Sequence, residues 1–393
     1  MTAYAKKKQA LLPAIVILFW FAQYVYIPYQ TPYLLSVQVS EVFLGSILGA
    51  YGITQMLLRI PVGVMADSVG KHKYFILSGT LAASIASLIR FLIPDGYGFL
   101  AANLLSGMAS SMWISFMVMY TGFFPEEEQQ KATGRIILCN NLGILSGFLL
   151  SSLLYKYFGM SLLCILSIAA GALGTVLTFF LKEEKGRGTF SLSSFSSLKI
   201  CLHKRLILFS LLALIQQGVQ MSTAMSFTAQ ILKMRGASSF IIGLSSIIYM
   251  ISAVLTSAVS SSKRAVRLGA RVLVPVVFLA LAAYCILVPI TPYIPLLLAL
   301  QLLPGMATGI LFSNLTSEAM KGIPLKVKST AMGFYQAVYA LGMTLFPMFT
   351  GKFIADFSYF TAYLLLALSA LIGTAASFCY YYFQKNMSKS FFS

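Results

Sequence analysis

The chain is a succession of long apolar runs separated by short polar segments. Each run holds about 20 or more mostly apolar residues, the length at which an α-helix crosses the hydrocarbon core of a bilayer. The runs lack the alternation of apolar and polar residues that is typical of membrane-barrel strands, and a helix satisfies its own backbone groups in hydrocarbon. Twelve membrane-spanning helices are therefore predicted, at residues 11–36, 42–66, 74–94, 98–124, 133–156, 159–181, 205–232, 239–261, 270–290, 293–316, 329–351 and 357–383.

Composition supports an integral membrane protein. Of the 393 residues, 59% are hydrophobic and 10% are charged, whereas a soluble domain carries about 25% charged residues. A soluble enzyme, a disordered regulator and a disulfide scaffold are thereby excluded. The first apolar run follows three lysines, but it is too long for a signal peptide and leads into Tyr24, Tyr26 and Tyr29 instead of a cleavage site. We interpret it as a retained first helix.

Basic residues gather on one side of the predicted spans. The net charge is +18, and 22 of the 28 Lys and Arg residues fall on the side of the N-terminus. Arg59 alone lies within a predicted span. The five basic residues of the opposite side are Arg90, Lys156, Lys233, Arg235 and Lys352. By the positive-inside rule both termini are cytoplasmic in a multi-pass protein of the cell membrane. The positive charge then faces anionic lipid, and no nucleic-acid partner is expected.

The chain divides into two similar halves. Residues 182–204 form the one long polar stretch and are predicted to be a cytoplasmic linker between six-helix bundles at 1–181 and 205–393. The pattern A-x-G-x8-G occurs at 132–143 and again at 331–342, an offset of 199 residues. The spacing of Gly45 to Tyr51 recurs in Gly243 to Tyr249, at an offset of 198. Such internal repeats are typical of transporters.

The loop after the second predicted helix carries a recognisable motif. It reads GVMADSVGKHK at residues 63–73 and resembles the signature loop of the major facilitator superfamily, G-x-x-x-D-R-x-G-R-R. Ser68 and His72 replace basic residues of that pattern. The matching positions, which form a candidate gating motif, are Gly63, Asp67, Gly70, Lys71 and Lys73.

The resemblance covers the whole chain and implies an all-α membrane fold of twelve helices in two pseudo-symmetric six-helix bundles. It further implies that Asp67 braces the cytoplasmic gate against a neighbouring helix. We expect Gly63 to allow close helix packing. The alternatives are a solvated acid for Asp67 and ordinary positive-inside anchors for Lys71 and Lys73.

Polar stripes indicate where a cavity lies. Side chains at steps of three or four residues share one helical face, and a polar face is unfavourable against lipid. The stripes are Asn103, Ser106, Ser110 and Trp113 in the fourth helix and Gln216, Gln220 and Thr223 in the seventh. The resemblance places helices 1, 4, 7 and 10 around a central cavity. Further candidates for it are Trp20, Gln23, Tyr24, Gln55, Arg59, Asn140, Asn141, Gln301, Asn314, Tyr335, Gln336 and Tyr339. The alternative for each amide is a packing hydrogen bond between helices.

Arg59 and the cysteines need separate interpretation. Arg59 is a gate element or a partner for an anionic substrate, or else an anchor that snorkels to the inner surface. The five cysteines form no close pair in the sequence and are interpreted as reduced fillers. The two histidines fall in inner loops, so no metal site is expected, and no catalytic motif or cofactor-binding motif is present. The chain is therefore not predicted to be an enzyme.

These observations predict a monomeric secondary transporter that moves a small organic solute by alternating access of its two halves. Gly134, Gly143 and Gly147 resemble the start of the antiporter motif of drug exporters, which favours efflux of amphiphilic compounds. The fourth helix has Asn103 where proton-linked exporters carry Arg, and no carboxylate falls at mid-membrane. Both features favour the alternative of a facilitator or an uptake transporter for a sugar or other neutral metabolite. A non-transporting receptor or scaffold is the remote alternative.

Overall fold

The computed structural model is helical throughout the part of the chain that it describes, which confirms the predicted all-α membrane fold. It describes residues 3–69, 71–124, 129–181, 198–260, 263–323 and 328–390. The helices of the first half are α1 (Ala3–Tyr24), α2 (Ile27–Ser36), α3 (Glu41–Val69), α4 (Lys73–Leu92), α5 (Gly96–Ser111), α6 (Trp113–Thr121) and α7 (Gln129–Phe179).

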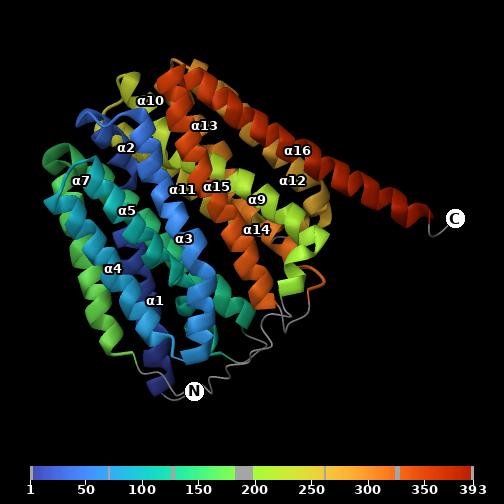
Figure 1. The fold of residues 1–393 in the computed structure, drawn as a ribbon, viewed down its shortest axis with the longest axis horizontal. Coiled ribbons are helices and arrows are strands. Elements are labelled where there is room, and N and C mark those ends of the chain that lie inside the picture. The colour runs from blue at the N-terminus through green and yellow to red at the C-terminus, as the bar shows by residue number, and fades with distance from the viewer. Residues whose placement is uncertain are drawn as a thin grey trace.

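The second half follows a short 3-10 helix, η2 (Leu198–Leu202), and lies beside the first half in Figure 1. Its elements are α9 (Lys204–Ser222), the π-helix η3 (Thr223–Phe227), α10 (Thr228–Met234), α11 (Ser239–Ser260), α12 (Lys263–Ile290), α13 (Ile294–Leu300), α14 (Leu302–Met320), α15 (Lys328–Asp356) and α16 (Tyr359–Ser390). The predicted linker at 182–204 falls largely outside the described residues, so its role stays a prediction.

The length of α7 accounts for two of the predicted spans. Eleven helical segments in the described residues are long and apolar enough to cross a membrane, and one of them, Arg135–Phe179, has 45 residues. At about 1.5 Å per residue it would be roughly twice as long as a bilayer core is thick. Gly159 interrupts it with a φ of +63° and divides it into two helices, 135–158 and 160–179. The segment therefore crosses twice, which agrees with twelve spans.

Four predicted spans are interrupted near their middle, where continuous helices were expected. The breaks lie between α1 and α2, at Met112 between α5 and α6, at η3, and at Gln301 between α13 and α14. The first and last come shortly before Pro28 and Pro304, which have no backbone N–H to donate within a helix. The interrupted helices are the first, fourth, seventh and tenth, the ones expected to surround the cavity.

The internal repeat holds in three dimensions. In the first half the Tyr51 hydroxyl lies 2.8 Å from Ser110 Oγ, and in the second half the Tyr249 hydroxyl lies 3.0 Å from Thr308 Oγ1. The partners are 59 residues apart in both pairs. The two bundles therefore pack their second and fourth helices in the same way.

Glycines of α3 bring the two halves into close contact. A Cβ atom on Gly45 would lie 2.5 Å from the Pro347 carbonyl oxygen, and one on Gly52 would lie 2.5 Å from Thr344 Oγ1 in α15. Gly63, which was expected to allow close helix packing, is less tightly approached by the residues described around it. A Cβ there would lie 3.9 Å from the nearest side-chain atom, that of Ile114, which is ordinary contact.

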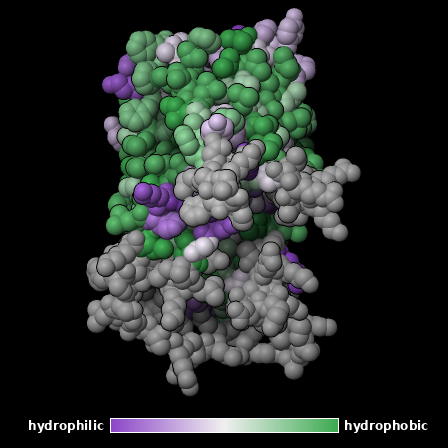
Figure 2. Space-filling model, turned by 90° about the vertical axis from the view of Figure 1, so that its right-hand side faces the viewer, coloured by the Kyte–Doolittle hydropathy of each residue, from purple (hydrophilic) through white to green (hydrophobic). Residues whose placement is uncertain are grey.

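Hydrogen bonds between the halves occur at two levels in the described residues. At the end of the molecule that carries α2 and α10 in Figure 1, the Tyr29 hydroxyl donates to the Ser239 carbonyl (2.6 Å), and Lys233 donates to the Pro32 carbonyl (2.9 Å). The second level is at Arg59, described below. The face shown in Figure 2 carries a broad band of apolar side chains, as a lipid-facing surface does.

Candidate substrate cavity

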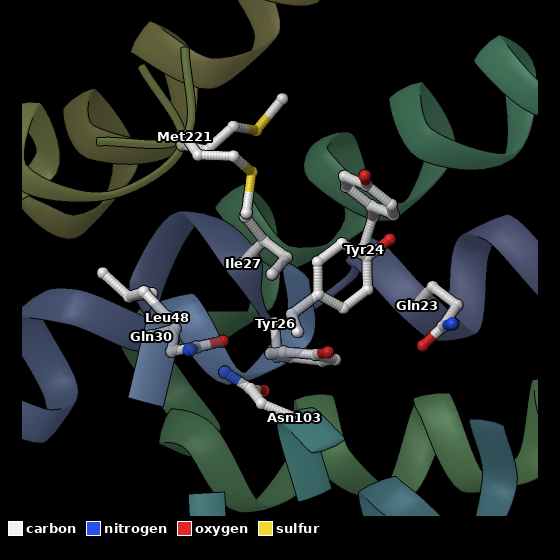
Figure 3. Close-up of a pocket in the computed structure, with 10 residues that line it drawn as sticks. Gln23, Tyr24, Tyr26, Ile27, Gln30, Leu48, Asn103 and Met221 are labelled. Carbon is white, nitrogen blue, oxygen red and sulfur yellow. The ribbon is translucent and has the colours of Figure 1, made fainter. Parts of the chain in front are cut away.

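A pocket lies where the break between α1 and α2 meets α3, α5, α9 and η3. Its space between atoms is about 420 Å³, counting the part open to solvent. Its lining residues are Gln23, Tyr24, Tyr26, Ile27, Gln30, Leu48, Tyr51, Asn103, Met221 and Met225, and Figure 3 shows eight of them labelled. Met221 and Met225 come from the second half and the other residues from the first, so the pocket lies between the two halves.

Gln23 connects the first helix to the fourth beside this pocket. Its Nε2 donates to Ser110 Oγ and to the Ser106 carbonyl, at 2.9 Å each. Ser110 also bonds Tyr51. The structure thus brings together the candidates Gln23, Ser106 and Ser110, with Tyr24 and Asn103 in the wall of the same pocket.

Aromatic packing holds another group of candidates together. Trp20 makes an edge contact with Trp113, their ring centroids 5.4 Å apart, and lies 5.6 Å from the Tyr24 ring. The indole Nε1 of Trp20 is buried without a hydrogen-bond partner in the described structure. Asn140 and Asn141 are half-buried in α7, and the Oδ1 atom of Asn140 likewise has no partner among the residues described.

Arg90 was assigned to the outer side as one of five basic residues there, and the structure shows that its side chain is buried. Its side chain is 1% exposed. The Nη2 atom donates to Asn103 Oδ1 and to Ser106 Oγ, both at 2.8 Å, and Nη1 donates to Ser87 Oγ at 3.3 Å. The guanidinium carbon lies 4.0 Å from the Tyr26 ring centroid. Hydropathy places Arg90 at a helix end, but its side chain turns into the bundle.

Arg90 also changes the interpretation of the fourth helix. That helix has Asn103 where proton-linked exporters carry Arg, and the guanidinium of Arg90 reaches Asn103 from α4. A buried basic group is therefore present beside the pocket, and Arg59 is not alone within the spans.

Arg59 joins the two halves. Its guanidinium is buried and donates to Gln55 Oε1 within α3, and across the interface to Gln336 Oε1 (3.1 Å) and the Tyr339 hydroxyl. Its carbon lies 5.0 Å from the Tyr339 ring centroid. Of the interpretations left open by the sequence, a snorkelling anchor does not describe this geometry, because every one of these contacts lies inside the protein.

The candidates of the second half separate into several sites. Gln216 donates to Gln220, which donates to the Tyr249 hydroxyl at 2.7 Å. The remaining candidates make other contacts: Thr223 and Asn314 bond carbonyls of their own helices, Gln301 bonds Tyr284, and Tyr335 bonds Thr316.

The gating motif is described in part. Gly70 and the side chain of Asp67 lie outside the described residues, so the predicted brace stays a prediction. Lys71 lies over the Tyr74 ring, with 5.6 Å from Nζ to the centroid. Lys73 donates to the Phe179 carbonyl near the end of α7, at 2.8 Å.

Several pocket residues were missed by the sequence analysis. Tyr26 and Gln30 continue the face that begins with Gln23, at steps of three and four residues, so periodicity could have found them. Met221 and Met225 are also one turn apart, but their apolar side chains are indistinguishable from packing in a sequence.

Two six-helix halves around an interfacial pocket define a polytopic membrane protein built like a secondary transporter. The family profile described as "Major Facilitator Superfamily" matches residues 14–347 and 220–390, and the chain belongs to that family. The resemblance inferred from the signature loop is thereby confirmed. Proteins of this family are transporters, and the chain is not an enzyme.

Curated relatives match part of this chain. Solute carrier family 67 member A1 of Homo sapiens is 27% identical over 163 residues, covering 40% of this chain. The inner membrane transport protein YajR of Escherichia coli (strain K12) is 24% identical over 177 residues, covering 42%. The chain matches 38% of the length of each relative.

Solved structures match over nearly the full length. The nucleoside transporter NupG superposes with a TM-score of 0.76 at 16% identity, covering 95% of this chain and 98% of that one. A bacterial homologue of the human lysosomal transporter Spinster, inward-facing and unoccupied, gives 0.72 at 16% identity, covering 98% and 97%. At such identities the likeness establishes the fold.

Proposed function

We propose that the chain moves a small amphiphilic organic solute across the cell membrane by alternating access, with the solute bound in the pocket lined by Gln23 and Met221. The observation that carries this proposal is the pocket itself, whose wall comes from both halves. A movement of one half against the other must change such a pocket, which is what alternating access requires.

The proposed orientation places both termini in the cytoplasm, as the distribution of basic residues favours. The end closed by Tyr29 and Ser239 is then the outer end. The conformation has its outer gate closed, and transport requires α3 and α15 to separate there.

The proposed direction is export. It rests on the glycine spacing of the fifth helix and on a lining of tyrosines and methionines, side chains that adapt to varied amphiphiles. The second candidate is uptake or facilitated transport of a neutral metabolite, supported by the amides of Gln23, Gln30 and Asn103 in the same wall. Flux measured in right-side-out and inside-out vesicles separates the two directions.

A reversible lock tests the mechanism. A Cβ on Gly49 would lie 2.9 Å from Met348 Cγ and 2.6 Å from the Thr344 carbonyl oxygen across the closed outer gate, so a cysteine at each position can form a disulfide once the α15 backbone shifts by a few tenths of an ångström. We expect the variant with Gly49→Cys and Met348→Cys to lose solute flux in proteoliposomes on oxidation and to regain it on reduction. Each single substitution, treated in the same way, is the control. Equal flux from the oxidised and reduced double variant would contradict alternating access at this gate.

A further inference from the structure

Arg90 is a buried cation whose contacts in the described structure are all uncharged. Its nitrogens bond the amide of Asn103 and the hydroxyls of Ser87 and Ser106, and its flat face covers Tyr26. Removing a guanidinium from water without a counter-charge is strongly unfavourable. An ionisable group held inside a membrane protein is therefore expected to serve a function.

The carboxylates of the described residues do not neutralise Arg90. Asp95, the one closest in sequence, is exposed and accepts a hydrogen bond from the Gly98 backbone N–H at the start of α5. Glu318 pairs with Arg205 near the opposite end of the second bundle. The positive charge of Arg90 is thus left uncompensated by the side chains described around it.

The fold itself does not require this charge. At the repeat offset of 198 residues, Val288 stands in the place of Arg90 and Gln301 in the place of Asn103. In that half Gln301 Nε2 donates to the Tyr284 hydroxyl at 3.3 Å. In the second bundle the neutral Tyr284 hydroxyl therefore bonds the amide, where in the first bundle the charged Arg90 guanidinium does so.

The charge stands directly behind the wall of the pocket. Tyr26 and Asn103 line the pocket and also contact Arg90. The Nε atom of Arg90 has no hydrogen-bond partner in the described structure. One layer of side chains separates Arg90 from the pocket, and its charge is little screened there, because the protein and lipid around it have a low dielectric constant.

The side-chain amide of Gln30 is a second polar group of the pocket that is able to bind a ligand. Gln30 is 1% exposed and lines the pocket, and neither its side-chain oxygen nor its nitrogen has a hydrogen-bond partner in the described part of the chain. In Figure 3 the amides of Gln30 and Asn103 point toward one another beside Tyr26. An amide N–H at this place can donate to an oxygen of a ligand.

We propose that the solute of this pocket is an organic anion, a carboxylate on an apolar or aromatic frame, and that Arg90 is the positioning charge that selects it. The carboxylate would lie beside Gln30 and Asn103, within the field of Arg90. The frame would pack on Tyr24, Met221 and Met225. This inference rests on the proposed function, in which the pocket holds the transported solute.

Matched probes test the charge selection. Binding of naphthalene-2-carboxylate and naphthalene-2-carboxamide to the purified full-length chain in nanodiscs is measured by equilibrium dialysis. We expect the carboxylate to bind about ten-fold more tightly than the amide. We expect Arg90→Gln to reduce this ratio to about one and Arg90→Lys, which keeps the charge, to retain most of it. Equal binding of the two probes to the unmodified chain overturns the proposal, as does the absence of binding of both.

A second variant keeps Arg90 in place and cancels its charge. Asn103→Asp has nearly the shape of asparagine and sets a carboxylate against the guanidinium, so the ratio should again fall to about one even if Arg90→Gln does not fold. The matched control is Arg235→Gln, at an exposed arginine that bonds the Pro289 carbonyl, and it should leave the ratio unchanged. A carboxylate preference that survives Asn103→Asp overturns the role of Arg90.

Flux measurements separate this proposal from the one on which it rests. Proteoliposomes that carry the amide as fast as the carboxylate would contradict anion selection and leave the transport function intact. Proteoliposomes that carry neither probe, from a chain that binds the carboxylate selectively, would contradict transport and leave the binding site intact.

Discussion

Arg59 Nη1 lies 3.1 Å from Gln336 Oε1, and this hydrogen bond ties α3 of the first half to α15 of the second. The same guanidinium also bonds Gln55 and Tyr339. This one side chain thus connects the two bundles at a point of α3 that lies C-terminal to the glycines in contact with α15. Because alternating access moves the bundles against each other, the strength of this connection should affect both stability and turnover.

The first prediction concerns the charge of this connection. Gln336→Glu should raise the melting temperature and slow turnover, because a carboxylate supplies the counter-charge that buried Arg59 lacks among the contacts described here. Arg59→Gln should lower the stability by roughly 1.5–3 kcal/mol, the range for hydrogen bonds made by charged groups. Thermal unfolding in detergent and solute flux in proteoliposomes measure the two effects.

The double variant with Arg59→Gln and Gln336→Glu is the control for this pair. If the stabilisation by Gln336→Glu depends on Arg59, it should disappear in the double variant. Unchanged turnover in Gln336→Glu would mean that the Arg59 contact persists through the whole transport cycle.

The second prediction compares two glycines of α3. Gly52→Ala should destabilise the closed conformation, since its Cβ would press on the Thr344 backbone nitrogen at 2.8 Å and on the Ala340 carbonyl oxygen at 2.9 Å. Gly63→Ala is the matched control in the same helix and should be tolerated, because a Cβ there makes ordinary contact with Ile114. Melting temperature and flux are compared for the two. A larger effect at Gly63 would show that the conformation described here is not the one that limits transport.

The fold was largely predictable from the sequence because a bilayer imposes a simple rule on hydropathy. Twelve apolar runs of sufficient length predict twelve crossings, and the offset of 198 residues predicts the equivalence of Tyr51 with Tyr249. The breaks within helices were harder to predict from the sequence. Pro28 and Pro304 explain two of them, while the breaks at Met112 and at η3 have no such residue at the break itself.

The candidate site was predictable only in part, for a physical reason. Periodicity identifies which side chains share a helix face, and it grouped Asn103 with Ser110; the structure has Asn103 in the pocket wall and Ser110 bonded to Gln23 beside it. Periodicity does not say how a long side chain bends. Arg90 lies close to a polar loop in the sequence, yet its partners Asn103 and Ser106 are 13 and 16 residues away in another helix.

The third prediction tests the orientation of the chain through Cys201. This residue lies in η2, between the two halves, and is partly exposed. We expect a membrane-impermeant maleimide to label it in inside-out vesicles and not in intact cells. Partial burial raises the pKa of the Cys201 thiol, so the thiolate fraction is reduced at neutral pH and labelling should accelerate as the pH rises. Cys201→Ser identifies the signal, and labelling in intact cells would contradict the cytoplasmic placement.

The fourth prediction concerns Asp67 of the signature loop. If its carboxylate braces the cytoplasmic gate, Asp67→Asn should impair transport without loss of expression, because the amide has the same size and lacks the charge. Flux per molecule of purified protein in proteoliposomes measures the effect. The matched control is Asp95→Asn, the same chemical change at the N-cap of α5, where Asp95 accepts from the Gly98 backbone N–H. Asparagine caps helices about as well as aspartate, so this control should preserve both stability and flux. Unaltered turnover in Asp67→Asn would remove Asp67 from the gate and leave the signature loop with a role in topology alone.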